Sequence, residues 1–144
     1  MLAAAVLVVG ALALTLDGTA PLANATYGKH VSSALGRVAA TTARPTDGSS
    51  ADISRSLRRT KRAVDTAAST LAALAPPDGA RVMHRRLVAD LHEYARQLDL
   101  VRASVDFGDM ATIAVHLQAM TAPAQIARDT AALNAAGFDV SEGA

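Results

Sequence analysis

The feature that most constrains the fold is a regular apolar repeat between residues 87 and 105. Its members alternate between spacings of four and three residues: Leu87, Leu91, Tyr94, Leu98, Val101 and Val105. This alternation places them on one face of a long α-helix, as in the helices of a bundle. Pro76-Pro77 precedes the repeat and Gly108 follows it, and both are typical of helix boundaries. The sequence therefore predicts a central helix over residues 78–106.

Two further apolar repeats predict helices before the central one. The first covers residues 27–43, where four residues share a face: Tyr27, Val31, Leu35 and Val38. The second covers residues 51–75 and has the same alternation of four and three: Ile53, Leu57, Thr60, Val64, Ala67, Leu71 and Leu74. Turn-forming residues separate the two repeats, and Ser49 or Ser50 is suited to cap the second helix.

A fourth helix is predicted over residues 109–136, after an Asp109 cap. Its first half has an apolar face, and the phase shifts after Pro123, which predicts a kink at that proline. Short connections between consecutive helices favour antiparallel neighbours. The expected fold is therefore all-α: an up-down antiparallel four-helix bundle over residues 26–137, preceded by an N-terminal hydrophobic signal or anchor helix. Residues 138–144 are expected to form a loose tail.

The N-terminal segment carries an uninterrupted apolar run over residues 2–16, followed by Ala23-Asn24-Ala25. An apolar run before a small-x-small tripeptide is typical of an export signal. Residues 1–25 are therefore interpreted as a signal peptide that is cleaved to leave Thr26 first, and the protein as secreted or resident in the cell envelope. The alternative is an uncleaved membrane anchor formed by residues 2–16, although the run is short for a membrane-spanning helix.

The composition excludes several classes of site. The chain has no cysteine, so disulfides, thiolate zinc sites, iron–sulfur clusters and cysteine nucleophiles are ruled out. Aromatic residues make up only 3% of the chain, which is poor material for stacking nucleic-acid bases. The net charge of +1 produces no overall field that selects a polyanion. Nucleic acid is therefore an unexpected partner.

The histidines and hydroxyl residues do not form a recognisable catalytic or metal-binding pattern. No histidine has a carboxylate or a second histidine three or four residues away, so a metal pair within one helix is excluded. No serine lies in a Gly-x-Ser-x-Gly sequence. His84 falls on the apolar face of the central helix and is interpreted as a packed histidine, with haem ligation together with Met120 as the alternative. The prediction is a protein without catalytic, cofactor-binding or metal-binding residues, and not an enzyme.

A cluster of cations in the second predicted helix is the one concentrated electrostatic feature. It contains five positive side chains within eight residues: Arg55, Arg58, Arg59, Lys61 and Arg62. Such a cluster suits contact with an anionic surface, whether a lipid headgroup layer, a cell-wall polymer or an acidic protein. The alternative is a solvated helix face partly balanced by Asp65. We refer to these five residues as the basic cluster.

The run LAALAPPDGARVMHRRLVADLHEYARQL resembles a pattern found in small exported all-helical proteins of GC-rich bacteria. The matching positions are Leu71, Leu74, Pro76, Pro77, His84, Leu87 and Tyr94. The resemblance covers about a fifth of the chain and implies a secreted helical domain with no particular activity. Many such proteins carry a lipid-anchoring cysteine, and this chain does not.

These observations together predict an exported, non-enzymatic helical bundle with a structural or interaction role, in which the basic cluster contacts an anionic surface of the cell envelope. The alternative is a membrane-anchored bundle that binds a ligand or acts as a sensor. A cavity of several hundred cubic ångströms between the helices would favour that alternative, because ligand sites usually have this volume. The oligomeric state is left open.

Overall fold

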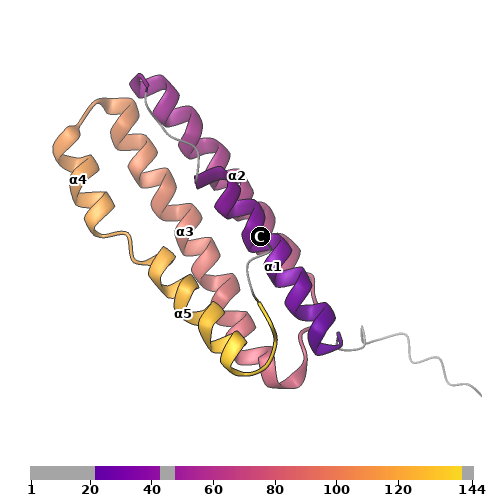
Figure 1. Cartoon of the computed structure of the whole chain (residues 1–144). Helices are drawn as coiled ribbons and strands as arrows, with labels where there is room; N and C mark the ends of the chain where they lie inside the picture. The colour runs from indigo at the N-terminus through magenta and orange to yellow at the C-terminus, as the bar shows by residue number, and fades with distance from the viewer. Residues whose placement is uncertain (1–21, 43–47, 141–144) are drawn as a thin grey trace, which may run out of the picture.

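The computed structural model describes residues 22–42 and 48–140, and these residues form an all-helical bundle (Figure 1). The helices are α1 (Asn24–Thr42), α2 (Ser50–Ala72), the 3₁₀ turn η1 (Asp78–Ala80), α3 (Arg81–Phe107), α4 (Met110–Gln118) and α5 (Ala122–Ala135). The predicted all-α class is confirmed. The predicted signal or anchor run over residues 2–16 lies outside the described residues. Among the helices that are described, none is long and apolar enough to span a membrane.

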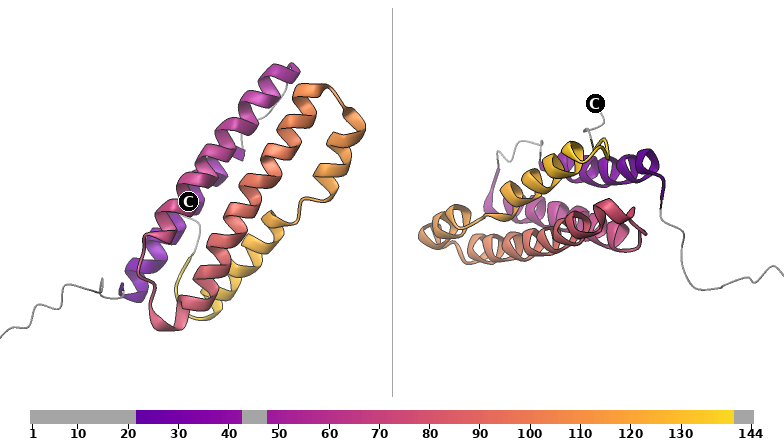
Figure 2. Two further views of the ribbon diagram at one scale, coloured as in Figure 1. Left: turned by 180° about the vertical axis from the view of Figure 1, so that it is seen from behind. Right: turned by 90° about the horizontal axis from the view of Figure 1, so that it is seen from below.

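The long helix α3 is the centre of the arrangement. It packs against α2 on one side and against α4 and α5 on the other, while α1 packs against α2. Figures 1 and 2 show α4 and α5 following one another along α3, so that together they take the place of one long helix. We call the end of the molecule near Gly108 the upper end and the end near η1 the lower end.

The core lies toward the lower end, where α1, α2, α3, α5 and the chain after α5 meet. Its central members, all with no exposed surface, are Tyr27, Val31, Val64, Leu71, Leu87, Leu91 and Leu133. The apolar face of α2 continues upward beyond this core, but Ile53 and Leu57 near its start are only half-buried. The upper part of the bundle is therefore less closed than the lower part.

The helix ends follow the local signals in the sequence. Ser49 caps α2, since its side chain accepts a hydrogen bond from the Asp52 N–H and the Asp52 carboxylate accepts one from the Ser49 N–H. Gly108 ends α3 in the left-handed conformation with φ of 72°, which is favourable only for a residue without a side chain. Asp109 then caps α4 through the Thr112 N–H at 3.0 Å.

The expectation of one kinked helix over residues 109–136 is wrong, because the structure has two helices. α4 ends at Gln118 and α5 begins at Ala122. Pro123 lies in the first turn of α5, where its missing N–H has no helical partner to lose. Inside a continuous helix, the ring of Pro123 would clash with the carbonyl of Ala119 four residues earlier, and the chain instead leaves the helix between Gln118 and Ala122. The Gln97 side-chain oxygen accepts the Ala122 N–H at 3.3 Å and holds this junction on α3.

The expectation of a loose tail after residue 137 is also wrong for the residues that the structure describes. Phe138 and Val140 are 4% and 1% exposed. The Phe138 ring packs edge-on against Tyr27, with ring centroids 5.7 Å apart, and the Asn134 side chain accepts the Val140 N–H. The chain after α5 thus closes the lower end of the core. Residues 141–144 lie outside the described part of the chain.

Candidate functional site

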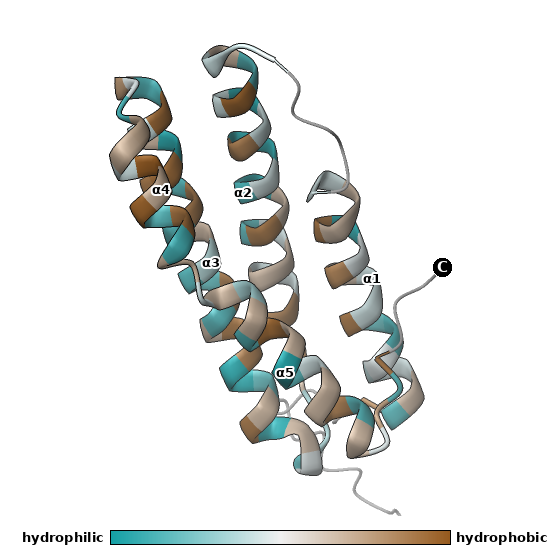
Figure 3. Ribbon diagram, turned by 60° about the vertical axis from the view of Figure 1, so that its left-hand side comes forward, coloured by the Kyte–Doolittle hydropathy of each residue, from teal (hydrophilic) through white to brown (hydrophobic). Residues whose placement is uncertain are grey.

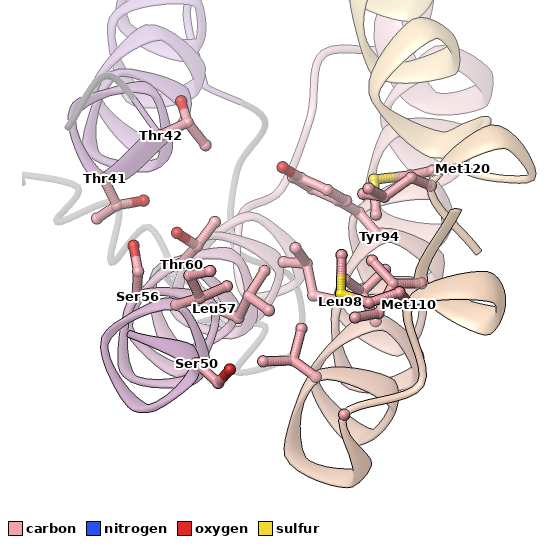
Figure 4. Close-up of a pocket in the computed structure, with 16 residues that line it drawn as sticks. Thr41, Thr42, Ser50, Ser56, Leu57, Thr60, Tyr94, Leu98, Met110 and Met120 are labelled. Carbon is pink, nitrogen blue, oxygen red and sulfur yellow. The ribbon is translucent and has the colours of Figure 1, made fainter. Parts of the chain in front are cut away.

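An apolar cavity of about 460 Å³ opens between α2, α3 and α4, at the end of α1. We call it the upper cavity. The α3 side is formed by Tyr94, Leu98, Val101 and Val105. The α4 side is formed by Met110, Ile113 and Leu117, and the α2 side by Ser50, Ile53, Ser56, Leu57 and Thr60. Figure 4 shows these side chains around the open space between the helices.

The upper cavity is present because α4 lies on α3 without closing onto α2. α4 packs against α3, and no comparable packing joins it to α2. None of the nine residues of α4 is buried, although the helix is markedly apolar, as its colouring in Figure 3 shows. The Ser104 hydroxyl and Nδ1 of His116, 3.0 Å apart, tie α4 to α3. Because α4 does not reach α2, it does not cover the apolar faces that α2 and α3 turn toward it. These faces remain open and form the walls of the cavity.

A second cavity of about 560 Å³ lies below the first, between α1, α3 and α5. We call it the lower cavity. Its wall is also mainly apolar and includes Leu35, Val38, Leu91, Pro123 and Ile126. Thr42 and Tyr94 line both cavities, so the two are adjacent, and we refer to them together as the groove. Each volume falls in the range of about 300–1,000 Å³ that is typical of ligand sites.

The groove contains hydroxyl groups without internal partners. Ser56 and Thr60 are 8% and 5% exposed, and neither makes a side-chain hydrogen bond to another described residue. The half-buried hydroxyl of Tyr94 likewise has no partner within the described ranges. In Figure 4 the Tyr94 hydroxyl extends from the α3 side toward the side that carries Thr60. Burial raises the pKa of Tyr94, so its hydroxyl stays protonated and can both donate and accept.

No charged residue lines either cavity within the part of the chain that the structure describes: the polar members of the two walls there are serine, threonine, tyrosine and asparagine. A groove of this composition offers dispersion contacts and a few neutral hydrogen bonds. It offers no ion pair to a charged group, whose burial without a partner is strongly unfavourable. The arrangement therefore suits an elongated, uncharged and mainly apolar molecule.

His84 has a structural role in the lower core. It is 5% exposed, and its Nδ1 lies 3.1 Å from the Tyr27 hydroxyl. The ring also makes a hydrogen bond to the backbone of Leu71. The neutral tautomer with its proton on Nε2 satisfies both contacts, because Nδ1 then accepts from tyrosine and Nε2–H donates to the carbonyl. His84 on α3 thereby joins α1 to the end of α2.

The structure gives no support to the alternative in which His84 and Met120 hold a haem. Met120 lines the upper cavity, whereas His84 lines a separate open cavity of about 580 Å³ beside Pro76 and Val88. None of these three cavities is lined by both side chains. Within the same residues, no cluster of three or more histidine and carboxylate side chains is arranged to hold a metal ion.

The structure divides the basic cluster into paired and unpaired members. Lys61 bridges Asp65 at 2.6 Å and Asp99 of α3 at 3.5 Å, so it helps to hold α2 against α3. Arg55 pairs with Asp52 at 3.3 Å. Arg58, Arg59 and Arg62 are exposed and form no ion pair with any described residue. We call these three the free arginines.

The free arginines and the groove lie on different faces of α2. The groove is lined by positions 50, 53, 56, 57 and 60, and a helical period of 3.6 residues places positions 58, 59 and 62 on the opposite side. The helix therefore presents an uncharged wall to the interior and a positive face to the exterior. One copy of the protein can therefore use the uncharged wall and the positive face at the same time.

The sequence contained a signal for the groove that the apolar pattern alone did not reveal. Thr60 occupies a core position in the α2 repeat, where its hydroxyl would normally need a partner. The α4 segment also carries more apolar residues than a helix needs when it packs through one face only. Comparison with models of protein families, with curated proteins and with solved structures finds no match for this chain.

Proposed function

We propose that this protein is a non-enzymatic binding protein that holds an elongated apolar molecule in the groove. The observation that supports this is the adjacency of two cavities that are both mainly apolar and have no charged residue among their described lining residues. Removing apolar surface from water contributes about 0.8 kcal/mol for each buried methylene group. In a groove of this kind, affinity depends more on the length of the ligand's apolar chain than on any single contact. Ligand binding is thus favoured over a purely structural role.

The proposal places the protein outside the cytoplasm, as a secreted or cell-envelope protein. Its support is the apolar run at residues 2–16 and the small-residue tripeptide that follows it. Cleavage after Ala25 would fall in the first turn of α1 and leave the buried Tyr27 near the new terminus. N-terminal sequencing of protein isolated from its natural source distinguishes the two forms, since Thr26 comes first after cleavage and an anchored form retains residues 2–16.

A bulky substitution on α4 tests the groove. Ile113 lines the upper cavity, and Ile113→Trp should fill part of it. We expect the affinity for 1-N-phenylnaphthylamine, an uncharged dye that fluoresces in apolar surroundings, to fall at least about tenfold because the volume for the dye is lost. Val115→Trp is the matched control: Val115 lies on the same helix, is 60% exposed and does not line the cavity. Fluorescence titration measures both.

Two results would contradict the groove as the binding site. One is a wild-type protein that does not enhance the fluorescence of the dye. The other is an equal loss of affinity in the Ile113→Trp and Val115→Trp proteins, which would place the dye elsewhere on α4. Circular dichroism spectra of both variants check that the helical content is retained.

A second candidate function is contact with an anionic surface through the free arginines. It is favoured by their exposure and by their lack of ion pairs within the described residues. The attraction of each basic side chain to an anionic lipid surface is about 1 kcal/mol and is screened by salt. This contact is compatible with ligand binding, because the positive face points away from the groove. It would bring the protein to a membrane or wall polymer without occupying the cavity.

Charge reversal tests the free arginines. We expect Arg58→Glu/Arg59→Glu to reduce sedimentation with vesicles containing 30% phosphatidylglycerol by at least about tenfold, because four units of charge change on the contact face. Arg37→Glu/Arg85→Glu makes the same change in net charge at exposed positions on α1 and α3 and should have a much smaller effect. Wild-type binding that persists unchanged at 1 M salt would rule out this electrostatic contact.

A further inference from the structure

We infer that the ligand is a single-chain amphiphile with an uncharged, hydrogen-bonding head group, bound at Ser56, Thr60 and Tyr94. This inference rests on the proposed binding function and names the class of ligand. The head group is a hydroxyl, an ester or an amide. The chain extends along the apolar wall that α3 and α4 form in the upper cavity.

The three hydroxyls are available because they are not used within the protein. Other hydroxyls in these helices bond to the carbonyl one turn earlier: Thr66 bonds to Arg62, Ser104 to Leu100 and Thr130 to Ile126. Ser56 and Thr60 are more than nine-tenths buried, yet they make no such bond. Their side chains line the upper cavity, and their oxygens are not among the solvent-inaccessible unpartnered atoms of the described residues, which are Ser54 Oγ and Asp129 Oδ2. A ligand that fills the cavity excludes water from these hydroxyls, so it binds best when it supplies a donor or acceptor of its own.

The position of these hydroxyls suits a head group. Ser56 and Thr60 line the upper cavity from α2, and Tyr94, which lines both cavities, faces them from α3. Beyond them, toward the upper end, the α3 and α4 walls are apolar, with Leu98, Val101 and Ile113 among them. One ligand can therefore place its polar group among the hydroxyls while its chain covers the apolar wall.

The head group is inferred to be uncharged because the described walls of the groove provide no opposite charge. Among residues 22–42 and 48–140, no lysine, arginine, histidine, aspartate or glutamate lines either cavity. A carboxylate placed beside Thr60 would lose its hydration without gaining an ion pair. A plain alkane would leave the hydroxyls without partners. A neutral head group avoids both penalties and is therefore the ligand that the groove accommodates best.

Competition between two ligands with the same chain length tests the inference. Bound 1-N-phenylnaphthylamine is titrated at pH 8 with monolaurin in one experiment and with laurate in another. Each ligand is kept below the concentration at which it forms micelles. We expect monolaurin to displace the dye from the wild-type protein at a concentration at least about tenfold lower than laurate requires, because laurate is charged at this pH. Equal displacement by the two ligands, or stronger displacement by laurate, would overturn the inference.

Removal of one hydroxyl assigns the preference to a residue. Thr60→Val should reduce the advantage of monolaurin over laurate to about threefold or less, because the volume is kept and a hydrogen bond is lost. The two ligands are compared within each variant, after the affinity of that variant for the dye has been measured. Tyr94→Phe is a second variant with the same expectation. Thr66→Val is the control, since Thr66 lies on the outer surface of α2. An unchanged preference in both Thr60→Val and Tyr94→Phe would overturn the assignment.

The outcomes separate the inference from the proposed function. If the dye binds in the groove but the two ligands displace it equally, the groove binds apolar molecules and the head-group assignment is wrong. If the dye does not bind the wild-type protein, the proposed function fails and the inference fails with it. A preference for monolaurin that disappears in Thr60→Val and persists in Thr66→Val supports both.

Discussion

Gly28→Ala is expected to lower the free energy of unfolding by about 3 kcal/mol. A Cβ at position 28 would lie 1.9 Å from the Phe138 carbonyl oxygen and 2.6 Å from that of Asp139. Both atoms belong to the backbone, so the chain after α5 would have to move away from α1. Displacement would expose the buried side chains of Phe138 and Val140, each of which stabilises the fold by about 1.5–3 kcal/mol. Unfolding in urea, followed by circular dichroism, measures the change.

Gly36→Ala on the same helix is the matched control. No atom lies within 4 Å of a Cβ placed at Gly36, and alanine stabilises a helix interior by about 0.5–1 kcal/mol relative to glycine. We therefore expect a small increase in stability. A Gly28→Ala protein as stable as Gly36→Ala would show that the segment after α5 is not held against α1 as described here.

Tyr27→Phe is the second substitution with a large expected effect. It removes the hydroxyl that bonds to Nδ1 of His84 and leaves that nitrogen buried without a partner. Loss of a buried hydrogen-bond partner lowers stability by about 1–3 kcal/mol. Tyr94→Phe is the control, because the Tyr94 hydroxyl has no partner among the described residues, and its removal should change stability by less than about 0.5 kcal/mol. Equal urea midpoints for the two variants would contradict the role of the Tyr27–His84 bond.

The burial of His84 also makes stability depend on pH. Burial lowers the pKa of His84 below its ordinary value of 6.5, and the bond to the Leu71 backbone partly opposes this shift. Between the lowered pKa and 6.5 the unfolded chain binds more protons than the folded one, so stability decreases as the pH falls through this interval. Urea unfolding at pH 8, 6 and 5 should show a steady decrease of the midpoint. A midpoint that rises toward pH 5 would contradict a buried neutral His84.

The features predicted correctly from the sequence are those that depend on local spacing. The central helix was predicted because Leu87, Leu91 and Leu98 recur with the period of a helix, and all three are buried in the structure. The boundary at Gly108 and the cap at Asp109 were also predicted from adjacent residues. His84 was placed on the apolar face by counting, and it is buried there. Helical period and capping act within a few residues, so a single sequence contains them.

The features that were missed depend on contacts between distant parts of the chain. Phe138 and Val140 follow a glycine in a polar segment. Nothing in the neighbouring sequence indicates that their side chains close the lower end of the core beside α1. Lys61 was assigned to an exposed basic cluster, but its second partner, Asp99, is 38 residues away on α3. The groove was missed for the same reason, since an apolar repeat does not show whether a neighbouring helix covers it.

The division of the last predicted helix is an intermediate case. Pro123 was recognised as an interruption, and the phase of the apolar residues was seen to change there. Whether a proline bends a helix or ends it depends on the contacts available to the freed backbone. Here the Gln97 side chain accepts the Ala122 N–H from a position 25 residues earlier, which is a tertiary contact and outside the range of local reasoning.

The unequal lengths of the helices add a second reason for the upper cavity, beside the position of α4. α3 has 27 residues and α1 has 19, a difference of eight residues, or about 12 Å at 1.5 Å per residue. α1 ends at Thr42, where the upper cavity begins. About two more turns would bring α1 to the length of α3. The volume available to a ligand is therefore set by where one helix stops, and a short insertion or deletion near the end of α1 would change the size of ligand that this bundle admits.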